Sequence, residues 1–221
     1  MKHVLIDISG IFCQESFYSA LKSGGLSASI VDLTDLEGTN CYCSEEAAEV
    51  IRAKVCAQPV RSICWIDTGD YHYLSYFRGR CISEPFELVL IDNHTDDFDM
   101  AGILSCGNWV SALLREPCCK TSRLIRSVAD DSYGAVSDLP VFLSIDLDVL
   151  RPEDFRTNWD QGSMTLEELL DIIGSLAACR RIAAIDICGG ITESKGASAS
   201  DLANNLQVRL RLIDHLRKLG I

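Results

Sequence analysis

The chain has 221 residues, of which 48% are hydrophobic and 24% charged, and its formal net charge at pH 7 is −12. A chain of this length buries a core of good size without a disulfide or a metal to hold it together. The negative charge argues against nucleic acids and anionic membrane surfaces as partners, because both select for basic patches.

Short apolar runs with β-branched residues, bounded by turn or polar residues, predict six buried strands. In chain order these strands occupy residues 4–8, 29–33, 61–66, 86–91, 141–145 and 182–187. Helices are predicted between and after them. Their ranges are 44–57, opened by a Ser-Glu-Glu cap, 108–115, 165–178, opened by a Thr-x-x-Glu capping box, and 199–219.

Alternation of strands and helices predicts βαβ units and a mostly parallel sheet in one domain that spans residues 1–221. Near-continuous apolar strands agree with a sheet that is covered by helices on both faces. In such α/β folds, ligands bind at the carboxyl ends of the strands. Chemistry is therefore expected in the loops that follow the predicted strands.

The N-terminus is interpreted as a first strand rather than a signal peptide, and no run approaches the roughly 18 apolar residues that span a bilayer. A cytoplasmic location is expected. The 11 cysteines form no CxxC pair, and an odd count without an export signal argues against a disulfide scaffold. Cys64, Cys106, Cys179 and Cys188 lie in apolar runs and are interpreted as small buried hydrophobic residues.

Three predicted strands are followed by clusters of metal-ligand residues. Residues 92–96 read Asp-Asn-His-Thr-Asp after the strand at 86–91, and residues 146–148 read Asp-Leu-Asp after the strand at 141–145. Residues 69–72 read Gly-Asp-Tyr-His shortly after the strand at 61–66. Side chains at i, i+2 and i+4 of an extended segment project to the same side. The candidate ligands are His72, Asp92, His94, Asp96, Asp146 and Asp148.

Four carboxylates gathered in one place repel one another, and some would be protonated unless cations neutralise them. Two divalent ions balance this charge, and carboxylate with imidazole suits Mn²⁺, Mg²⁺ or Zn²⁺. Ions about 3.5–4 Å apart can share one water and activate it as a nucleophile. Taken singly, each acidic motif is also typical of a solvated loop. The three motifs together favour a two-metal site.

The motifs resemble those of the ureohydrolase family, the arginases and agmatinases. That family carries Gly-Gly-Asp-His, then Asp-Ala-His-x-Asp, then Ser-x-Asp-x-Asp-x-x-Asp-Pro, and the matching segments here are 69–72, 92–96 and 144–152. The resemblance implies a three-layer α/β/α fold and two Mn²⁺ ions. It implies that one ion is held by His72, Asp92, Asp96 and Asp146, and the other by Asp92, His94, Asp146 and Asp148.

The chain departs from the family pattern at several places. Tyr71 is inserted before the first histidine, and Arg151 replaces the last acid of the third motif. Val110 occupies the slot of the arginase acid/base histidine, and Gly189 occupies the slot of the acid that grips a guanidinium group. Two further acids are assigned to catalysis: Glu193 as a substitute for the missing carboxylate, and Asp70 as a group that orients a ligand or caps a helix.

The first hypothesis is a manganese-dependent hydrolase of a non-peptide C–N bond. By the resemblance, a metal-bridging hydroxide attacks a guanidino or amidine carbon of a small molecule, and arginine itself is not the expected substrate. Two alternatives stay open: a metal-binding homologue with impaired catalysis, and a deacetylase-like enzyme with one zinc ion. A phosphoesterase is disfavoured because no basic cluster accompanies the motifs. Family members often form oligomers, so a homo-oligomer is compatible with the sequence.

Overall fold

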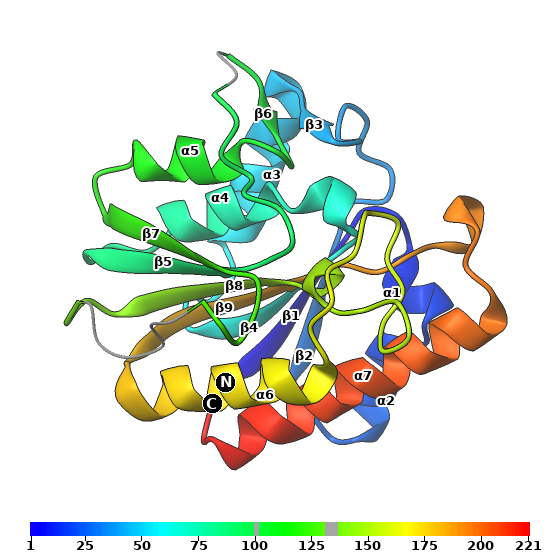
Figure 1. Ribbon diagram of the computed structural model, residues 1–221. Coiled ribbons are helices and arrows are strands. Elements are labelled where there is room, and N and C mark those ends of the chain that lie inside the picture. Colours follow the sequence, from blue (N-terminus) through cyan, green and yellow to red (C-terminus); the bar gives the residue numbers. More distant parts are fainter. Residues whose placement is uncertain (100–101, 131–136) are drawn as a thin grey trace.

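The computed structural model describes residues 1–99, 102–130 and 137–221. Its centre is a seven-stranded parallel sheet in the order β2-β1-β4-β9-β8-β5-β7 (Figure 1). The strands of this sheet are β1 (Lys2–Asp7), β2 (Ala28–Asp32), β4 (Ser62–Ile66), β5 (Phe86–Ile91), β7 (Cys119–Ile125), β8 (Val141–Asp146) and β9 (Ile182–Cys188). A separate antiparallel pair joins β3 (Tyr42–Cys43) to β6 (Leu104–Ser105).

Helices cover both faces of the sheet, so the predicted three-layer α/β/α architecture is confirmed (Figure 1). One face carries α3 (Glu45–Cys56), α4 (Leu74–Arg80) and α5 (Trp109–Leu114). The other carries α1 (Ile11–Gln14), α2 (Phe17–Ser23), α6 (Leu166–Cys179) and α7 (Ala199–Lys218). Three short 3₁₀ turns follow strands: η1 (Gly69–Tyr71), η2 (Leu147–Val149) and η3 (Glu193–Lys195).

Each face of the sheet has its own hydrophobic core because successive strand side chains point to opposite faces. In β1, Leu5 packs with the core under α6 and α7, whereas its neighbour Val4 packs with the core under α3, α4 and α5. Both residues are fully buried. Central strands buried on both faces account for the near-continuous apolar runs of the sequence.

The predicted strands and helices agree with the structure to within a few residues. Ser44 caps α3, and Thr165 with Glu168 forms the predicted capping box of α6. Strands β3, β6 and β7 and helices α1, α2 and α4 were not predicted. Among the described residues, no helix has the length and apolar character to cross a membrane.

All 11 cysteines are free thiols. Cys64 and Cys188 are buried, as predicted, but the same prediction is wrong for Cys179, which is exposed, and for Cys106, which is partly exposed. Cys179 lies in the last turn of α6, where the helix leaves the core, and Cys106 directly follows β6.

The strand order brings the predicted ligand segments together. β4, β9, β8 and β5 are consecutive neighbours in the sheet and all run in parallel, so their carboxyl ends lie at one edge. The chain leaves β4, β8 and β5 at this edge to form the three motif segments. Loops at such an edge are the usual ligand site of an open α/β sheet.

Candidate metal centre

The structure brings all six predicted ligands into one cluster at this edge. His72 follows η1, Asp146 ends β8, and Asp148 lies in η2. The other three follow β5. Donor atoms from five of the six ligands form two overlapping groups with metal-ligand spacing. One group is made of His72, Asp92 and Asp96, and the other of Asp92, His94 and Asp148.

The first group surrounds the Nδ1 atom of His72. This nitrogen lies 3.3 Å from Asp92 Oδ2, 3.1 Å from Asp96 Oδ2 and 3.3 Å from Asp146 Oδ2. One oxygen from each of three carboxylates therefore faces one imidazole nitrogen. A third group of compatible spacing adds Cys188, at the end of β9, to His72 and Asp146.

The second group surrounds the Nδ1 atom of His94, which lies 2.8 Å from Asp148 Oδ2 and 3.6 Å from Asp92 Oδ1. Asp92 thus turns Oδ2 toward the His72 group and Oδ1 toward the His94 group. Asp146 also links the two sides, because its Oδ1 accepts a hydrogen bond from the backbone N–H of Asp148 at 3.0 Å. Two adjacent groups that share Asp92 are an arrangement suited to two ions.

Unpaired donor atoms in the cluster fit a metal. His72 Nδ1 and Asp92 Oδ2 are buried and, although they lie 3.3 Å apart, neither makes a hydrogen bond of good geometry. Polar atoms buried in this way are unfavourable unless something pairs with them. The donors are carboxylate oxygens and imidazole nitrogens, which suit hard or borderline divalent ions.

The protonation of the cluster leads to the same conclusion. Burial, followed by the neighbouring charge of Asp148, raises the pKa of Asp146 well above its usual value. Burial also raises the pKa of Asp148 to about 6. The pKa of His94 rises to about 10 because it is hydrogen bonded to Asp148 and then to Asp92. Asp146 and Asp148 thus resist ionisation while His94 stays protonated, and the pKa of Asp92 is instead lowered by its contacts with the two histidines despite its burial. Cations bound among these groups would favour the ionised carboxylates and the neutral imidazoles.

A chain of buried polar side chains supports His72 from behind. Its Nε2 lies 3.0 Å from Ser144 Oγ, and Ser144 lies 3.3 Å from the hydroxyl of Ser75. Ser75 donates to Asp186 Oδ2 at 3.0 Å, and Arg78 Nε donates to Asp186 Oδ1 at 3.2 Å. Sequence reasoning missed these residues. Asp186, an acid inside an otherwise apolar predicted strand, was the sequence feature that could have indicated a buried polar network.

Asp96 is held from the side of α5. The indole N–H of Trp109 donates to Asp96 Oδ2 at 2.7 Å, and the backbone N–H of Val110 donates to the Asp96 carbonyl at 3.0 Å. Asp96 has a positive φ of 48°, an uncommon backbone conformation that these two contacts hold in place. Val110 is 3% exposed and apolar, so it offers no proton donor or acceptor from its side chain.

Asp70 lies beside the cluster and binds the loop that follows β8. Its Oδ1 accepts hydrogen bonds from Asn158 Nδ2 and Trp159 Nε1, each at 3.0 Å. Its Oδ2 lies 3.6 Å from Lys195 Nζ. The helix-cap alternative for Asp70 is wrong, because Thr68 is the residue at the N-cap of η1.

Gly189 and Glu193 lie in the segment after β9. Gly189 has a φ of +108°, and a Cβ there would lie 2.8 Å from Asp146 Oδ1, so this backbone leaves no room for a side chain. Glu193 is exposed in η3, and its backbone N–H donates to Gln14 Oε1 at 2.9 Å. The catalytic role of Glu193 stays a prediction.

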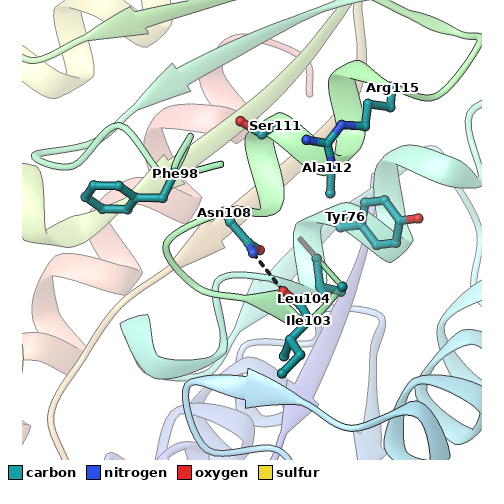
Figure 2. Close-up of a pocket in the computed structure, with 9 residues that line it drawn as sticks. Tyr76, Phe98, Ile103, Leu104, Asn108, Ser111, Ala112 and Arg115 are labelled. Atoms are coloured by element: carbon teal, nitrogen blue, oxygen red, sulfur yellow. Dashed lines mark hydrogen bonds between the residues drawn. The ribbon is translucent and has the colours of Figure 1, made fainter. Parts of the chain in front are cut away.

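Two cavities lie near the cluster. The first has a volume of about 80 Å³ and is bounded by every predicted ligand except His72, together with Gly69, Phe98, Cys106, Gly107 and Trp159. The second has a volume of about 160 Å³ and shares only Phe98 with it. Figure 2 shows the second cavity, where the Phe98 ring points away from Asn108, Ile103 and Arg115. The metal-ligand groups border the first cavity.

Comparisons with known proteins support the fold. No protein-family model matches the chain. An uncharacterized protein of Thermotoga maritima is 31% identical over 141 residues, which are 58% of this chain and 57% of that protein. The chain therefore matches less than two thirds of the length of this curated relative.

Several solved structures have the same fold at low sequence identity. Proclavaminate amidino hydrolase from Streptomyces clavuligerus superposes with a TM-score of 0.69 at 11% identity, covering 95% of this chain and 89% of that one. Formimidoylglutamase from Bacillus subtilis gives 0.68 at 15% identity, covering 99% and 86%. Trypanosoma cruzi formiminoglutamase with Mn²⁺ gives 0.63 at 13% identity, covering 95% and 91%. The predicted resemblance to the ureohydrolases is confirmed for the fold.

Proposed function

We propose that this chain, which has the ureohydrolase fold, is a dinuclear-metal hydrolase that cleaves a C–N bond of a small guanidino or amidine compound. The observation that carries the proposal is Asp92, whose two carboxylate oxygens face two separate imidazole-containing groups. The acids of an ordinary surface loop are solvated, whereas here four carboxylates are buried beside two histidines. The amidino hydrolase among the similar structures supports the same reaction class.

One ion would be held by His72, Asp92, Asp96 and Asp146, and the other by Asp92, His94, Asp146 and Asp148. Mn²⁺ is the proposed metal, since the donors are carboxylates and imidazoles and one similar structure contains Mn²⁺. Such ions, when bound, act as Lewis acids and lower the pKa of water.

The side chains around the cluster keep the ligands in place and limit access of water. Ser144 faces the Nε2 of His72, which leaves Nδ1 directed at the three carboxylates. Trp109 holds Asp96 through its indole N–H. Asp70 acts as a positioning residue, because it fixes Trp159 at the edge of the cavity. The two aromatic side chains Phe98 and Trp159 border the cavity and reduce its solvent-filled volume.

A second candidate is a metal-binding protein with impaired catalysis. The observations that favour it are the buried apolar Val110 in the acid/base slot and the crowded backbone at Gly189. A deacetylase-like site with one zinc ion needs only an Asp-x-His pair and one further Asp. His72 and Asp96 have no use in that arrangement, yet both contribute donor atoms to the cluster.

The proposal includes one domain over residues 1–221, a small-molecule substrate and a cytoplasmic location. A homo-oligomer is compatible with it.

The experiment is a screen of the Mn²⁺-loaded protein for release of urea or ammonia from guanidino and amidine compounds. We expect hydrolysis by the wild type and its loss in Asp148→Asn. Glu193→Gln measures the role assigned to Glu193, for which we expect a lower kcat. Two bound ions without hydrolysis of any compound would favour the impaired homologue.

A further inference from the structure

The cavity beside the metal cluster has a composition that selects among amidines. We propose that it takes a small planar amidinium or guanidinium that carries no charged tail, with Trp159 and Phe98 as its specificity-determining walls. This inference rests on the proposed function and adds the substrate class to it.

Trp159 is a fixed wall of the cavity. A Cβ on Gly69 would lie 2.6 Å from Trp159 Cδ1, so the indole lies directly against the Gly69 backbone. Its N–H donates to Asp70 Oδ1 at 3.0 Å, and its ring meets that of His94 edge to face with centroids 5.8 Å apart. Trp159 nevertheless remains 38% exposed. Part of the indole is therefore available to a ligand.

Phe98 forms another wall in a similar way. A Cβ on Gly107 would lie 3.3 Å from Phe98 Cδ2, and the backbone N–H of Phe98 donates to the Gly107 carbonyl at 3.0 Å. Phe98 is 66% exposed although it borders the metal cluster. The two cavity aromatics thus each lie against a glycine, where a larger residue would displace the ring.

The lining of the cavity offers no partner for a charged tail. Among the described residues that line it, the only charged or ionisable side chains apart from Cys106 are predicted metal ligands. No lysine or arginine in this lining would meet a carboxylate tail, and no spare acid would meet an ammonium group. In the neighbouring cavity, Arg115 already pairs with Asp99 at 2.9 Å.

The remaining features fit a small cation. The volume of about 80 Å³ is far below the roughly 300–1,000 Å³ of most ligand pockets. Gly189 supplies no carboxylate to grip an amidinium group. Aromatic rings attract planar cations through their quadrupoles, so Trp159 and Phe98 can replace that carboxylate.

The test compares acetamidine and methylguanidine with agmatine, guanidinoacetate and arginine. Hydrolysis of each is measured as kcat/KM, and binding as quenching of tryptophan fluorescence. Trp109 contacts Asp96 and His72 of the cluster, so the part of the quenching that is lost in Trp159→Leu is the part that reports on Trp159. We expect the untailed compounds to be favoured. Replacing either aromatic wall, by Trp159→Leu or Phe98→Leu, should lower kcat/KM for them about tenfold without loss of bound metal. The effect of Phe98→Leu on binding is measured by the same fluorescence quenching, because this variant keeps Trp159.

Val128→Ser is the matched control, because Val128 is exposed and apolar but lines neither cavity. A preference for the tailed compounds, or unchanged kcat/KM in both leucine variants, overturns the inference while leaving the hydrolase assignment intact. If two ions bind but nothing is hydrolysed, the proposed function fails. Quenching then decides the inference alone: tighter binding of untailed compounds supports it, and tighter binding of tailed ones or no binding overturns it.

Discussion

At the scale of single residues, the cluster depends on side chains that never touch a substrate. Ser144 is fully buried, and its hydroxyl is the group that faces the Nε2 of His72. We predict that Ser144→Ala folds with a stability loss of about 1 kcal/mol, because one buried hydrogen bond is removed. Its Mn²⁺ affinity should fall about 10–100-fold, because the imidazole loses the partner that sets its tautomer and direction.

Titration calorimetry with Mn²⁺ measures this affinity directly. Ser75→Ala is the matched variant, since Ser75 is also a fully buried serine but lies one contact further from His72. It should lose less affinity than Ser144→Ala. Equal affinities for wild type and Ser144→Ala would show that His72 needs no support from Ser144.

The ligands could be predicted from the sequence because their spacing is local. Asp92, His94 and Asp96 follow β5 within five residues, so any compact loop at the strand end keeps them close. The extended geometry expected for this segment is wrong, because residues 92–94 bend and Asp96 has a positive φ. Ser144, Trp109 and Cys188 could not be assigned in this way. Their roles depend on which strand lies beside which and on how α5 packs, and the chain reveals that only when folded.

At the scale of elements, α7 is anchored by a buried ion pair. Arg209 is fully buried, its Nε donates to Glu15 Oε2 at 2.6 Å, and its Nη2 donates to the Gly189 carbonyl at 2.6 Å. Its guanidinium also lies within 5.8 Å of the ring centroids of four aromatic residues. These contacts join α7 to α1 and to the segment after β9, beside the metal cluster.

We predict that Arg209→Met lowers the free energy of unfolding by about 3–5 kcal/mol, because Glu15 is left as an uncompensated buried charge. Arg211→Met is the control on the same helix. Arg211 pairs with Glu167 at an exposed position, where an ion pair contributes about 0–1 kcal/mol. Urea unfolding of both variants measures the difference. Similar losses in the two would contradict the anchoring role of Arg209.

The carboxyl ends of β1 and β4 carry a pair of neighbouring acids. Asp67 accepts backbone N–H groups from Ile8 at 2.6 Å and Ser9 at 2.7 Å, and Asp7 accepts one from Gly10 at 3.0 Å. Burial, followed by the charge of Asp67 and a hydrogen bond to it, raises the pKa of Asp7 from 3.8 to about 7. Asp32, the partner of Asp7 on β2, adds to this repulsion.

Because the folded-state pKa of Asp7 is raised, the folded chain binds more protons than the unfolded chain between about pH 4 and pH 7. This contribution to stability is present at low pH and is lost as the pH rises through 7. Asp7→Asn removes the titration and keeps a donor toward Asp67. It should therefore exceed the wild type in stability by about 2 kcal/mol at pH 8, with the advantage shrinking toward pH 4.

Urea unfolding at a series of pH values measures this effect. Asp171→Asn serves as the control, since Asp171 is an exposed acid on α6 and is not part of this group of acids. A pH-independent difference between Asp7→Asn and wild type would contradict the raised pKa of Asp7.

The elements that sequence reasoning missed are those without a continuous apolar pattern. β7 is an edge strand whose middle residues, from Lys120 to Leu124, are exposed or half-buried, so its sequence lacks the apolar run of a central strand. α1 has four residues and α2 seven, which is too short for a helical period to stand out. Of the six predicted strands, five are almost entirely buried, whereas the strand at 29–33 matches β2, an edge strand that is mostly half-buried or exposed.

At the scale of the whole molecule, the strand order determines where the charge of the chain is concentrated. The parallel sheet places the ends of β4, β8 and β5 near one another, and four buried carboxylates gather there in a chain of net charge −12. Repulsion among these groups opposes folding unless cations or protons offset it. The central claim is that two divalent ions provide this offset.

The most direct measurement is the number of metal ions per chain. The protein is stripped with a chelator, reloaded with Mn²⁺, freed of unbound metal and analysed for elements, with Asp146→Ala and Asp171→Ala beside it. Asp171 is an exposed acid on α6 and serves as the control. The account predicts two ions per chain in the wild type and in Asp171→Ala, and their loss in Asp146→Ala. A wild-type protein that retains no Mn²⁺, or an Asp146→Ala variant that still holds two ions, would contradict it.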